Sequence, residues 1–242
     1  MSKLISIICP YTNKEVLQML IDSLNMQKNQ NYELVLVNSK EHGFTSASQT
    51  LNYGASLAKG DIYVFCHQDI EFINSDAIDQ IFTYCNNYDF AIAGVAGATS
   101  NEPRTVSKVL DGPQKVQVGK EIFDVEEAEA LDECLFIIKK ENFKGFDDLG
   151  KTWHFYSVDY CLNAIEKNEK VLVLPIPIYH LSNGKSLNPN YYTMLVKLGK
   201  KHKKIKLINT TCLRVKNNWT LRINCFLRKL KFQLITKRKL KD

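Results

Sequence analysis

A histidine and a carboxylate stand directly after the most apolar stretch of the chain. Residues 62–66 read Ile-Tyr-Val-Phe-Cys, an unbroken apolar run typical of a strand that is buried on both faces. The run ends at His67-Gln68-Asp69. Because open α/β sheets bind ligands at the carboxyl ends of their strands, these side chains form a candidate polar site. The alternative interpretation is a strand followed by an ordinary polar turn.

The segments before this strand predict how it is positioned. Short apolar runs alternate with segments whose apolar residues have helical spacing. This pattern predicts strands at 4–9, 32–37 and 62–66 and helices at 14–26 and 47–58. The order β-α-β-α-β favours a parallel sheet with right-handed crossovers. We therefore expect a Rossmann-like α/β half.

The later segments are expected to extend the same sheet. They predict a helix at 77–84 and another from Val158 onward, and buried strands at 90–96, 130–138 and 171–178. Residues 99–119 contain two prolines and mixed polar residues, which predict a long loop or hairpin.

The composition excludes several classes of protein. The 242 residues suffice for one large α/β domain, or for one domain with an appendage. No run of about 18 apolar residues occurs, so we expect no transmembrane helix, and residues 1–8 predict a strand rather than a secretory signal. Neither a P-loop nor a G-x-G-x-x-G motif is present. Seven scattered cysteines without a C-x-x-C pair indicate a reducing, cytosolic setting without disulfides or a zinc site.

Charge is distributed unevenly along the chain. Residues 1–196 carry 16 lysines and arginines against 25 acidic residues, a net charge of −9. Residues 197–242 carry 16 basic residues and one acidic residue, a net charge of +15. The asymmetry predicts an acidic α/β domain over 1–196 and a basic extension over 197–242.

The basic extension predicts an amphipathic helix. Its apolar residues follow helical spacing, at Val215, Trp219, Ile223, Phe226, Leu230 and Leu234. A basic amphipathic helix with Trp and Phe is typical of an anchor on an anionic membrane surface. The alternatives are a partner-binding helix and a helix that packs on the domain. Nucleic acid is not expected as a partner, because the acidic body would repel a phosphate backbone.

Five segments, in this order, resemble family 2 glycosyltransferases. They are 7–13, 35–39, 50–54 with 58–61, 67–69, and 131–138 with 146–148 and 158–162. The resemblance extends from about residue 4 to residue 184. It implies a GT-A fold, which is a Rossmann-like, mixed and mostly parallel sheet flanked by helices, and it implies a nucleotide-sugar donor.

The resemblance also implies a divalent cation beside the donor diphosphate. His67-Gln68-Asp69 falls where the family has D-x-D, and His180 matches the family's C-terminal histidine, so Asp69 and His180 are the expected ligands. Mn²⁺ or Mg²⁺ would stabilise the departing diphosphate, and an imidazole ligand tilts the choice toward Mn²⁺. His67 stands in place of an acid, which predicts weaker metal affinity. The alternative for His180 is a hydrogen bond to a carbonyl group.

The implied nucleotide contacts lie at the ends of the first strands and in the second helix. They are Pro10, Tyr11, Asn13, Asn38, Asn52, Gly54 and His67. Asn38 replaces the aspartate with which the family usually binds uracil. An amide both donates and accepts hydrogen bonds, so Asn38 leaves the nucleotide base open. The alternative is an ordinary turn residue.

An inverting transfer needs a general base near the acceptor hydroxyl. The family usually takes it from a Glu-Asp pair, and Tyr156-Ser157 occupies those positions here. Asp159 is therefore the first candidate, with Asp132 and Glu133 in reserve. The alternative for Asp159 is an acid that favours the first turn of a helix through the helix dipole.

The resulting hypothesis is an inverting, metal-assisted glycosyltransferase. It would move a sugar from a nucleotide donor to a glycan or lipid-linked acceptor, as in bacterial surface-polysaccharide assembly. We expect it in the cytoplasm, peripherally on the inner face of the cell membrane. Two alternatives stay open. One is a non-catalytic member that binds a nucleotide sugar, because the Glu-Asp pair is missing. The other is a nucleotidyltransferase, although residues 10–13 lack the phosphate loop of that class.

Overall fold

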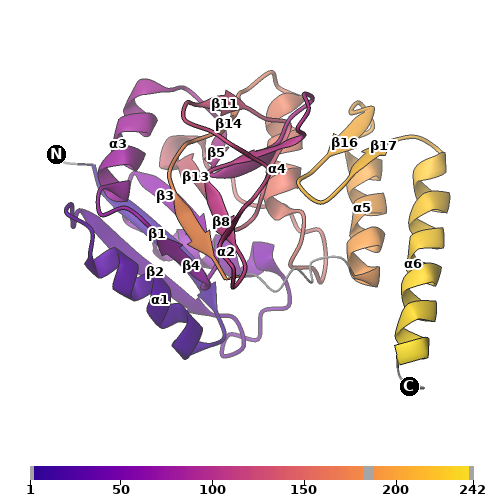
Figure 1. Cartoon of the computed structure of the whole chain (residues 1–242), viewed down its shortest axis with the longest axis horizontal. Coiled ribbons are helices and arrows are strands. Elements are labelled where there is room, and N and C mark those ends of the chain that lie inside the picture. The colour runs from indigo at the N-terminus through magenta and orange to yellow at the C-terminus, as the bar shows by residue number, and fades with distance from the viewer. Residues whose placement is uncertain (1–2, 182–187, 240–242) are drawn as a thin grey trace.

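A seven-stranded mixed sheet forms the centre of the molecule (Figure 1). The structure is a computed structural model that describes residues 3–181 and 188–239, with side chains as far as residue 232. The strand order is β11-β14-β5-β13-β3-β1-β2. The bounds are β1 (Ile5–Tyr11), β2 (Tyr32–Asn38), β3 (Ile62–Cys66), β5 (Ile92–Gly94), β11 (Glu126–Glu127), β13 (Leu135–Lys139) and β14 (Val171–Val173). β1 pairs in parallel with β2 and β3, whereas β13 lies antiparallel between β3 and β5. The expected mixed α/β fold is confirmed.

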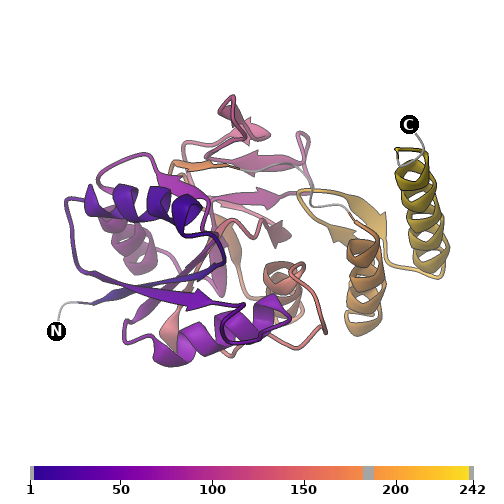
Figure 2. The ribbon, with the colours of Figure 1, turned by 90° about the horizontal axis from the view of Figure 1, so that it is seen from below.

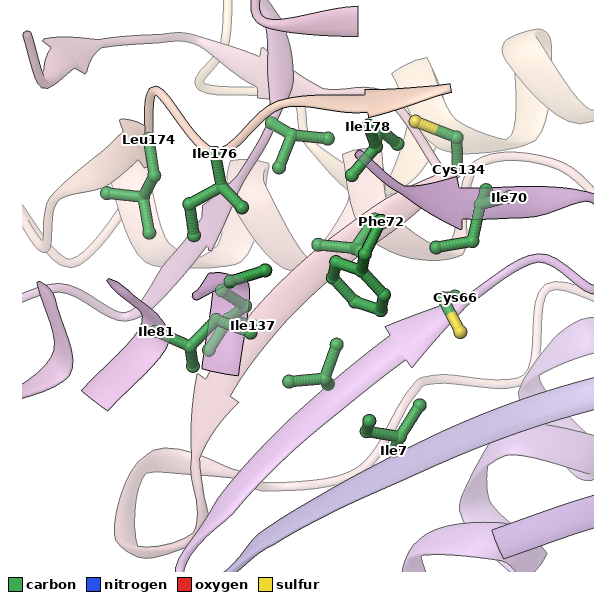
Figure 3. Close-up of a cluster of buried hydrophobic side chains, with 14 of the residues drawn as sticks. Ile7, Cys66, Ile70, Phe72, Ile81, Cys134, Ile137, Leu174, Ile176 and Ile178 are labelled. Carbon is green, nitrogen blue, oxygen red and sulfur yellow. The ribbon is translucent and has the colours of Figure 1, made fainter. Parts of the chain in front are cut away.

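Helices cover both faces of this sheet, as its unbroken apolar strands require. α1 (Lys14–Asn25) and α3 (Ala77–Asn87) pack on one face, and α2 (Ala47–Leu57) and α4 (Tyr156–Ile165) pack on the other. Ile62, Val64 and Cys66 of β3 belong to the first buried cluster, part of which Figure 3 shows. The alternate residues Tyr63 and Phe65 belong to the second cluster. β3 is thus buried on both faces, as its sequence predicts.

Two small sheets lie beside the central sheet. One has the order β4-β15-β8-β9, formed by β4 (Ile70–Phe72), β15 (Ile178–His180), β8 (Val109–Asp111) and β9 (Val116–Gln117). The other has the order β10-β7-β6-β12, formed by β10 (Lys120–Glu121), β7 (Thr105–Ser107), β6 (Ala96–Ala98) and β12 (Ala130–Leu131). Residues 99–119 therefore form short paired strands, which matches the hairpin alternative.

The C-terminal segment packs against α4, on the side of the molecule away from the N-terminus (Figures 1 and 2). This segment comprises α5 (Pro189–Lys201) and the hairpin of β16 (Leu207–Asn209) and β17 (Arg214–Lys216). Earlier in the chain, the short 3₁₀ helix η1 spans Lys140–Asn142 and α4 spans Tyr156–Ile165. α6 (Thr220–Lys239) follows and packs on α5. Residue 196 falls inside α5, so this helix crosses the expected boundary between domain and extension. Within the described parts of the chain, no helix is both long and apolar enough to cross a bilayer.

Candidate active site

Three side chains converge at the carboxyl end of β3. His67 and Asp69 lie in the turn between β3 and β4, and His180 ends β15 beside β4. His180 Nε2 lies 3.5 Å from Asp69 Oδ1 and 3.4 Å from His67 Nδ1, and His67 Nδ1 lies 3.9 Å from Asp69 Oδ1. The two imidazole nitrogens and the carboxylate oxygen could hold one metal ion. This donor set fits Mn²⁺ and other transition metals better than it fits Mg²⁺.

The three groups influence one another's protonation. Burial and the nearby His180 lower the pKa of His67. Burial would raise the pKa of Asp69, but the hydrogen bond and charge of His180 outweigh it and lower that pKa. Burial would lower the pKa of His180, and the same interaction with Asp69 raises it. Asp69 therefore stays ionised at neutral pH, as a metal ligand must be.

A fourth residue, Asp111, supports this group from β8. β15 pairs with β8 so that His180 lies opposite Asp111, and His180 Nδ1 lies 2.9 Å from Asp111 Oδ1. A carboxylate on the far nitrogen of a histidine fixes the ring orientation, a common arrangement behind metal ligands. The sequence analysis missed Asp111, because the three residues of β8 carry no strand signal within a stretch that reads as a loop.

A cavity of about 400 Å³ adjoins the His67–His180 corner. Two chain segments contribute to its lining. Asp132 and Glu133 belong to the segment between β12 and β13, and residues 210–212 belong to the C-terminal hairpin. Asp132 Oδ1 accepts from the Cys134 backbone N–H at 3.0 Å, and Asp132 Oδ2 accepts from Thr211 Oγ1 at 2.9 Å. A larger hollow of about 900 Å³, near the C-terminal ends of α3 and α4, is lined by none of the expected site residues.

Glu133 has an unusual environment in this cavity. Among the described residues, its Oε1 atom is buried without a hydrogen-bond partner. Burial and the neighbouring Asp132 raise the pKa of Glu133 well above its ordinary value. Backbone N–H groups of residues 155–157, at the start of α4, oppose this rise. A carboxyl with a strongly raised pKa is protonated at neutral pH more often than a surface glutamate.

The structure does not bring Asp159 into this cavity. Asp159 is 2% exposed, and it accepts from Lys201 Nζ at 2.6 and 2.7 Å. Its Oδ1 atom also lies 2.9 Å from Nε2 of the buried His202. Lys201 further contacts Asp147. Buried Asp159 and His202, with the more exposed Lys201 and Asp147, thus join α4 to the end of α5, which is a structural role.

Four of the expected nucleotide contacts lie along one edge of the sheet. Pro10 and Tyr11 end β1, and Asn38 ends β2 directly beside Tyr11. Asn38 Oδ1 accepts from the Lys40 backbone N–H, and Asn38 Nδ2 donates to Glu41, so Asn38 forms a turn. Asn13 Oδ1 accepts from backbone N–H groups and caps α1. Gln68 joins this edge to the turn that carries His67 and Asp69, because its Oε1 accepts from the N–H groups of residues 12 and 13.

The two expected contacts in α2 have structural partners. Asn52 makes two hydrogen bonds of 2.8 Å with the backbone of Phe146. A Cβ atom on Gly54 would lie 2.5 Å from Ile8 Cγ2, so only glycine lets α2 pack this closely on β1. The packing of α2 against the sheet accounts for both residues.

Comparisons with known proteins match the chain to one family and to several solved structures. Residues 6–206 match the glycosyltransferase-like family. Among curated protein sequences, none matches the chain. The mannosyltransferase PcManGT from Pyrobaculum calidifontis, solved with GDP-Man and Mn²⁺, has a TM-score of 0.57 and 14% identity, covering 85% of this chain and 65% of that structure.

Two further structures have a similar fold. GalNAc-T7, solved with UDP, GalNAc and Mn²⁺, has a TM-score of 0.61 and 12% identity, covering 82% of this chain and 48% of that structure. S. aureus TarS 1–349 has a TM-score of 0.54 and 15% identity, covering 82% of this chain and 65% of that structure. The chain thus spans less than two thirds of these structures. Because the family match covers most of the chain, this protein belongs to the glycosyltransferase-like family of transferases and has the GT-A fold.

Proposed function

We propose that the protein is an inverting, metal-assisted glycosyltransferase that uses a nucleotide-sugar donor. The observation that carries the proposal is the convergence of His67, Asp69 and His180 at the carboxyl end of β3, beside a cavity with its own carboxylates. The donor would thus bind beside His67, Asp69 and His180, and the acceptor would bind in the adjoining cavity. Solved relatives hold GDP-Man or UDP with Mn²⁺, so guanine and uracil donors are the first to test.

Asp69 and His180 would hold the metal, with His67 as a third ligand or as a contact to the donor. When bound, the divalent cation would stabilise the negative charge on the departing diphosphate. Asp69 supplies the one carboxylate of the group, and its lowered pKa keeps it ionised. Pro10, Tyr11 and Asn38 would face the nucleoside from the ends of β1 and β2. Asn13, Asn52 and Gly54 would support that side through packing and capping.

Asp132 is the general base that the arrangement supports best. It lines the cavity, and two hydrogen bonds hold its carboxylate in place. Glu133 is the second choice, because its raised pKa keeps it protonated over more of the neutral range. Asp159 is the weakest of the three candidates, since its carboxylate already pairs with Lys201 and His202.

The acceptor is proposed to be a glycan or lipid-linked glycan at an anionic membrane surface, as in bacterial surface-polysaccharide assembly. α6 supports this placement because it has two apolar faces. Leu221 and Cys225 are buried in the C-terminal cluster, whereas the exposed side carries Ile223, Phe226, Leu227 and Leu230, and the exposed Trp219 directly precedes the helix. Arg222 and Lys231 add positive charge to the exposed helix. A helix of this kind would lie on the inner face of the cell membrane and keep the enzyme in the cytoplasm.

Product analysis with a panel of UDP-, GDP- and dTDP-sugars, with and without Mn²⁺, tests the proposal. Release of a nucleoside diphosphate supports glycosyl transfer. Release of pyrophosphate would instead support a nucleotidyltransferase. Binding of a nucleotide sugar without turnover would support a non-catalytic member of the family, for which the missing Glu-Asp pair is the argument.

A further inference from the structure

We propose that the tip of the β16–β17 hairpin, residues 210–213, forms the acceptor-side wall of the cavity, and that Thr211 is a positioning residue for Asp132. The inference rests on the proposed function, because it assigns the acceptor side to this cavity. It gives the C-terminal extension a part in the reaction that is separate from any role at a membrane.

The tip is held rigidly by its own hydrogen bonds. Thr210 Oγ1 accepts from the Leu213 backbone N–H at 3.1 Å and donates to the Leu213 carbonyl oxygen at 3.1 Å. The Thr210 N–H also donates to the same carbonyl at 2.8 Å. Thr210 and Leu213 are both buried. A turn that is closed in this way can present Thr211 and Cys212 at a fixed place.

The hairpin is also fastened to the α/β domain. Asn209, which is 1% exposed, donates through Nδ2 to the Thr99 carbonyl oxygen and to Glu129 Oε2, both at 2.8 Å. Arg104 donates to the Thr211 carbonyl oxygen at 3.3 Å. These bonds join segments that lie about a hundred residues apart in the sequence. The tip therefore belongs to the cavity wall and is not a separate module beside it.

Thr211 then acts directly on the proposed base. Its Oγ1 donates to Asp132 Oδ2 at 2.9 Å, while the Cys134 N–H donates to Asp132 Oδ1. One donor belongs to the segment of Asp132 itself and the other to the hairpin tip, and together they fix the direction of the carboxylate. A hydrogen bond to a charged group is stronger than one between neutral groups, so its loss changes the rate measurably if it holds the base in place. Thr211 and Cys212 also face the space where an acceptor would bind, so they would limit its shape.

Thr211→Val tests this role, because valine keeps the shape of threonine and removes the donor. Thr211→Ser restores the hydroxyl, and Thr83→Val, on the exposed face of α3, is the matched control. Nucleoside diphosphate release is measured from pH 5 to pH 9 with the donor that the wild type uses, first with water alone as acceptor and then with octyl glycosides of glucose, galactose and N-acetylglucosamine. Donor affinity is measured separately by calorimetry, and thermal melting checks that each variant is folded.

We expect Thr211→Val to release nucleoside diphosphate roughly tenfold more slowly, in line with the loss of one hydrogen bond to a charged group. Donor affinity should stay within about twofold, so the loss lies in the rate and not in donor binding. Thr211→Ser should recover the wild-type rate. The inference is overturned if Thr211→Val keeps the wild-type rate across this pH range, or if it loses donor affinity in proportion to rate. A wild-type protein that neither binds nor cleaves any donor would instead overturn the proposed function.

Discussion

The imidazole of His180 is held by Asp111, with Nδ1 of the histidine 2.9 Å from Oδ1 of the aspartate. A proton on Nδ1 satisfies this contact, so Nε2 is the nitrogen that faces Asp69 and His67. The pairing of β15 with β8 thus fixes the orientation of the ring, and Nε2 would be available to a metal ion once it releases its proton. His180 is 13% exposed at its side chain, so few other partners compete for the ring.

Asp111→Asn should weaken Mn²⁺ binding roughly tenfold, because changes behind a histidine ligand typically cost 10- to 100-fold in metal affinity. Isothermal titration calorimetry of the purified protein measures this without relying on turnover. Asp89→Asn, at an exposed position away from the site, serves as the control. Equal Mn²⁺ affinity in wild type and Asp111→Asn would contradict the supporting role of Asp111.

Asp159→Asn should act mainly on stability. Removing one partner of a buried ion pair costs about 3–5 kcal/mol, and Asp159 pairs with both Lys201 and His202. Chemical denaturation gives the free energy of unfolding, and nucleoside diphosphate release is measured well below the melting temperature. We expect a large loss of stability with most of the rate retained. A stable variant whose rate falls by a factor of a hundred or more would instead mark Asp159 as the base.

Glu133 gives stability a pH dependence with a definite sign. Its pKa is raised in the folded state, whereas in the unfolded chain it is about 4.3. Above that value the folded state binds more protons at this site, so its contribution to the free energy of unfolding falls as the pH rises. Glu133→Gln removes this titration. As the pH rises from 4 to 8, the free energy of unfolding of the variant should therefore increase relative to that of wild type.

Denaturation curves at pH 4, 6 and 8 measure this difference, with Glu169→Gln at an exposed position as control. If the difference between Glu133→Gln and wild type is the same at all three values, the burial argument for Glu133 fails.

Local sequence pattern predicts the first half of the sheet well. The strands at β1, β2 and β3 and their helices follow from apolar runs and spacing, because each element shows its own periodicity. The meeting of Asp69 and His180 is expected from the family resemblance alone, because β15 lies in a different sheet from β3.

Contacts between short or distant segments could not be predicted in this way. Asp111 lies on a three-residue strand whose partner is about seventy residues away. From the sequence Asp159 is the first candidate for the general base, yet Lys201 and His202 at the end of α5 occupy its carboxylate. Asn52 looks like a ligand contact, yet its amide makes two hydrogen bonds with the backbone of Phe146. Tertiary packing decides these roles, and no local pattern records it.

The exposed side of α6 predicts binding to anionic membranes. Phe226 of α6 is 59% exposed, and Trp219, directly before the helix, is 78% exposed, and each would be buried at a lipid interface. Trp219→Ser with Phe226→Ser should weaken binding to vesicles containing phosphatidylglycerol at least tenfold, since burial of each large apolar side chain contributes about 1.5–3 kcal/mol. Binding should also weaken at high salt, because screening reduces the attraction of the basic residues.

Vesicle flotation measures this effect, with Phe123→Ser as the control, because Phe123 is 75% exposed outside α6. Two results would contradict the anchor. One is unchanged flotation of the double variant, and the other is equal loss in Phe123→Ser.

The central claim is that Asp69 holds a metal that assists departure of the diphosphate. It is tested most directly by nucleoside diphosphate release from the preferred donor across a Mn²⁺ titration, comparing wild type with Asp69→Asn. The account predicts that Mn²⁺ stimulates the wild type, and that Asp69→Asn is slower by roughly a hundredfold, because Lewis-acid stabilisation supplies several kcal/mol. A wild-type rate that is independent of Mn²⁺ and equal to that of a folded Asp69→Asn protein would contradict it.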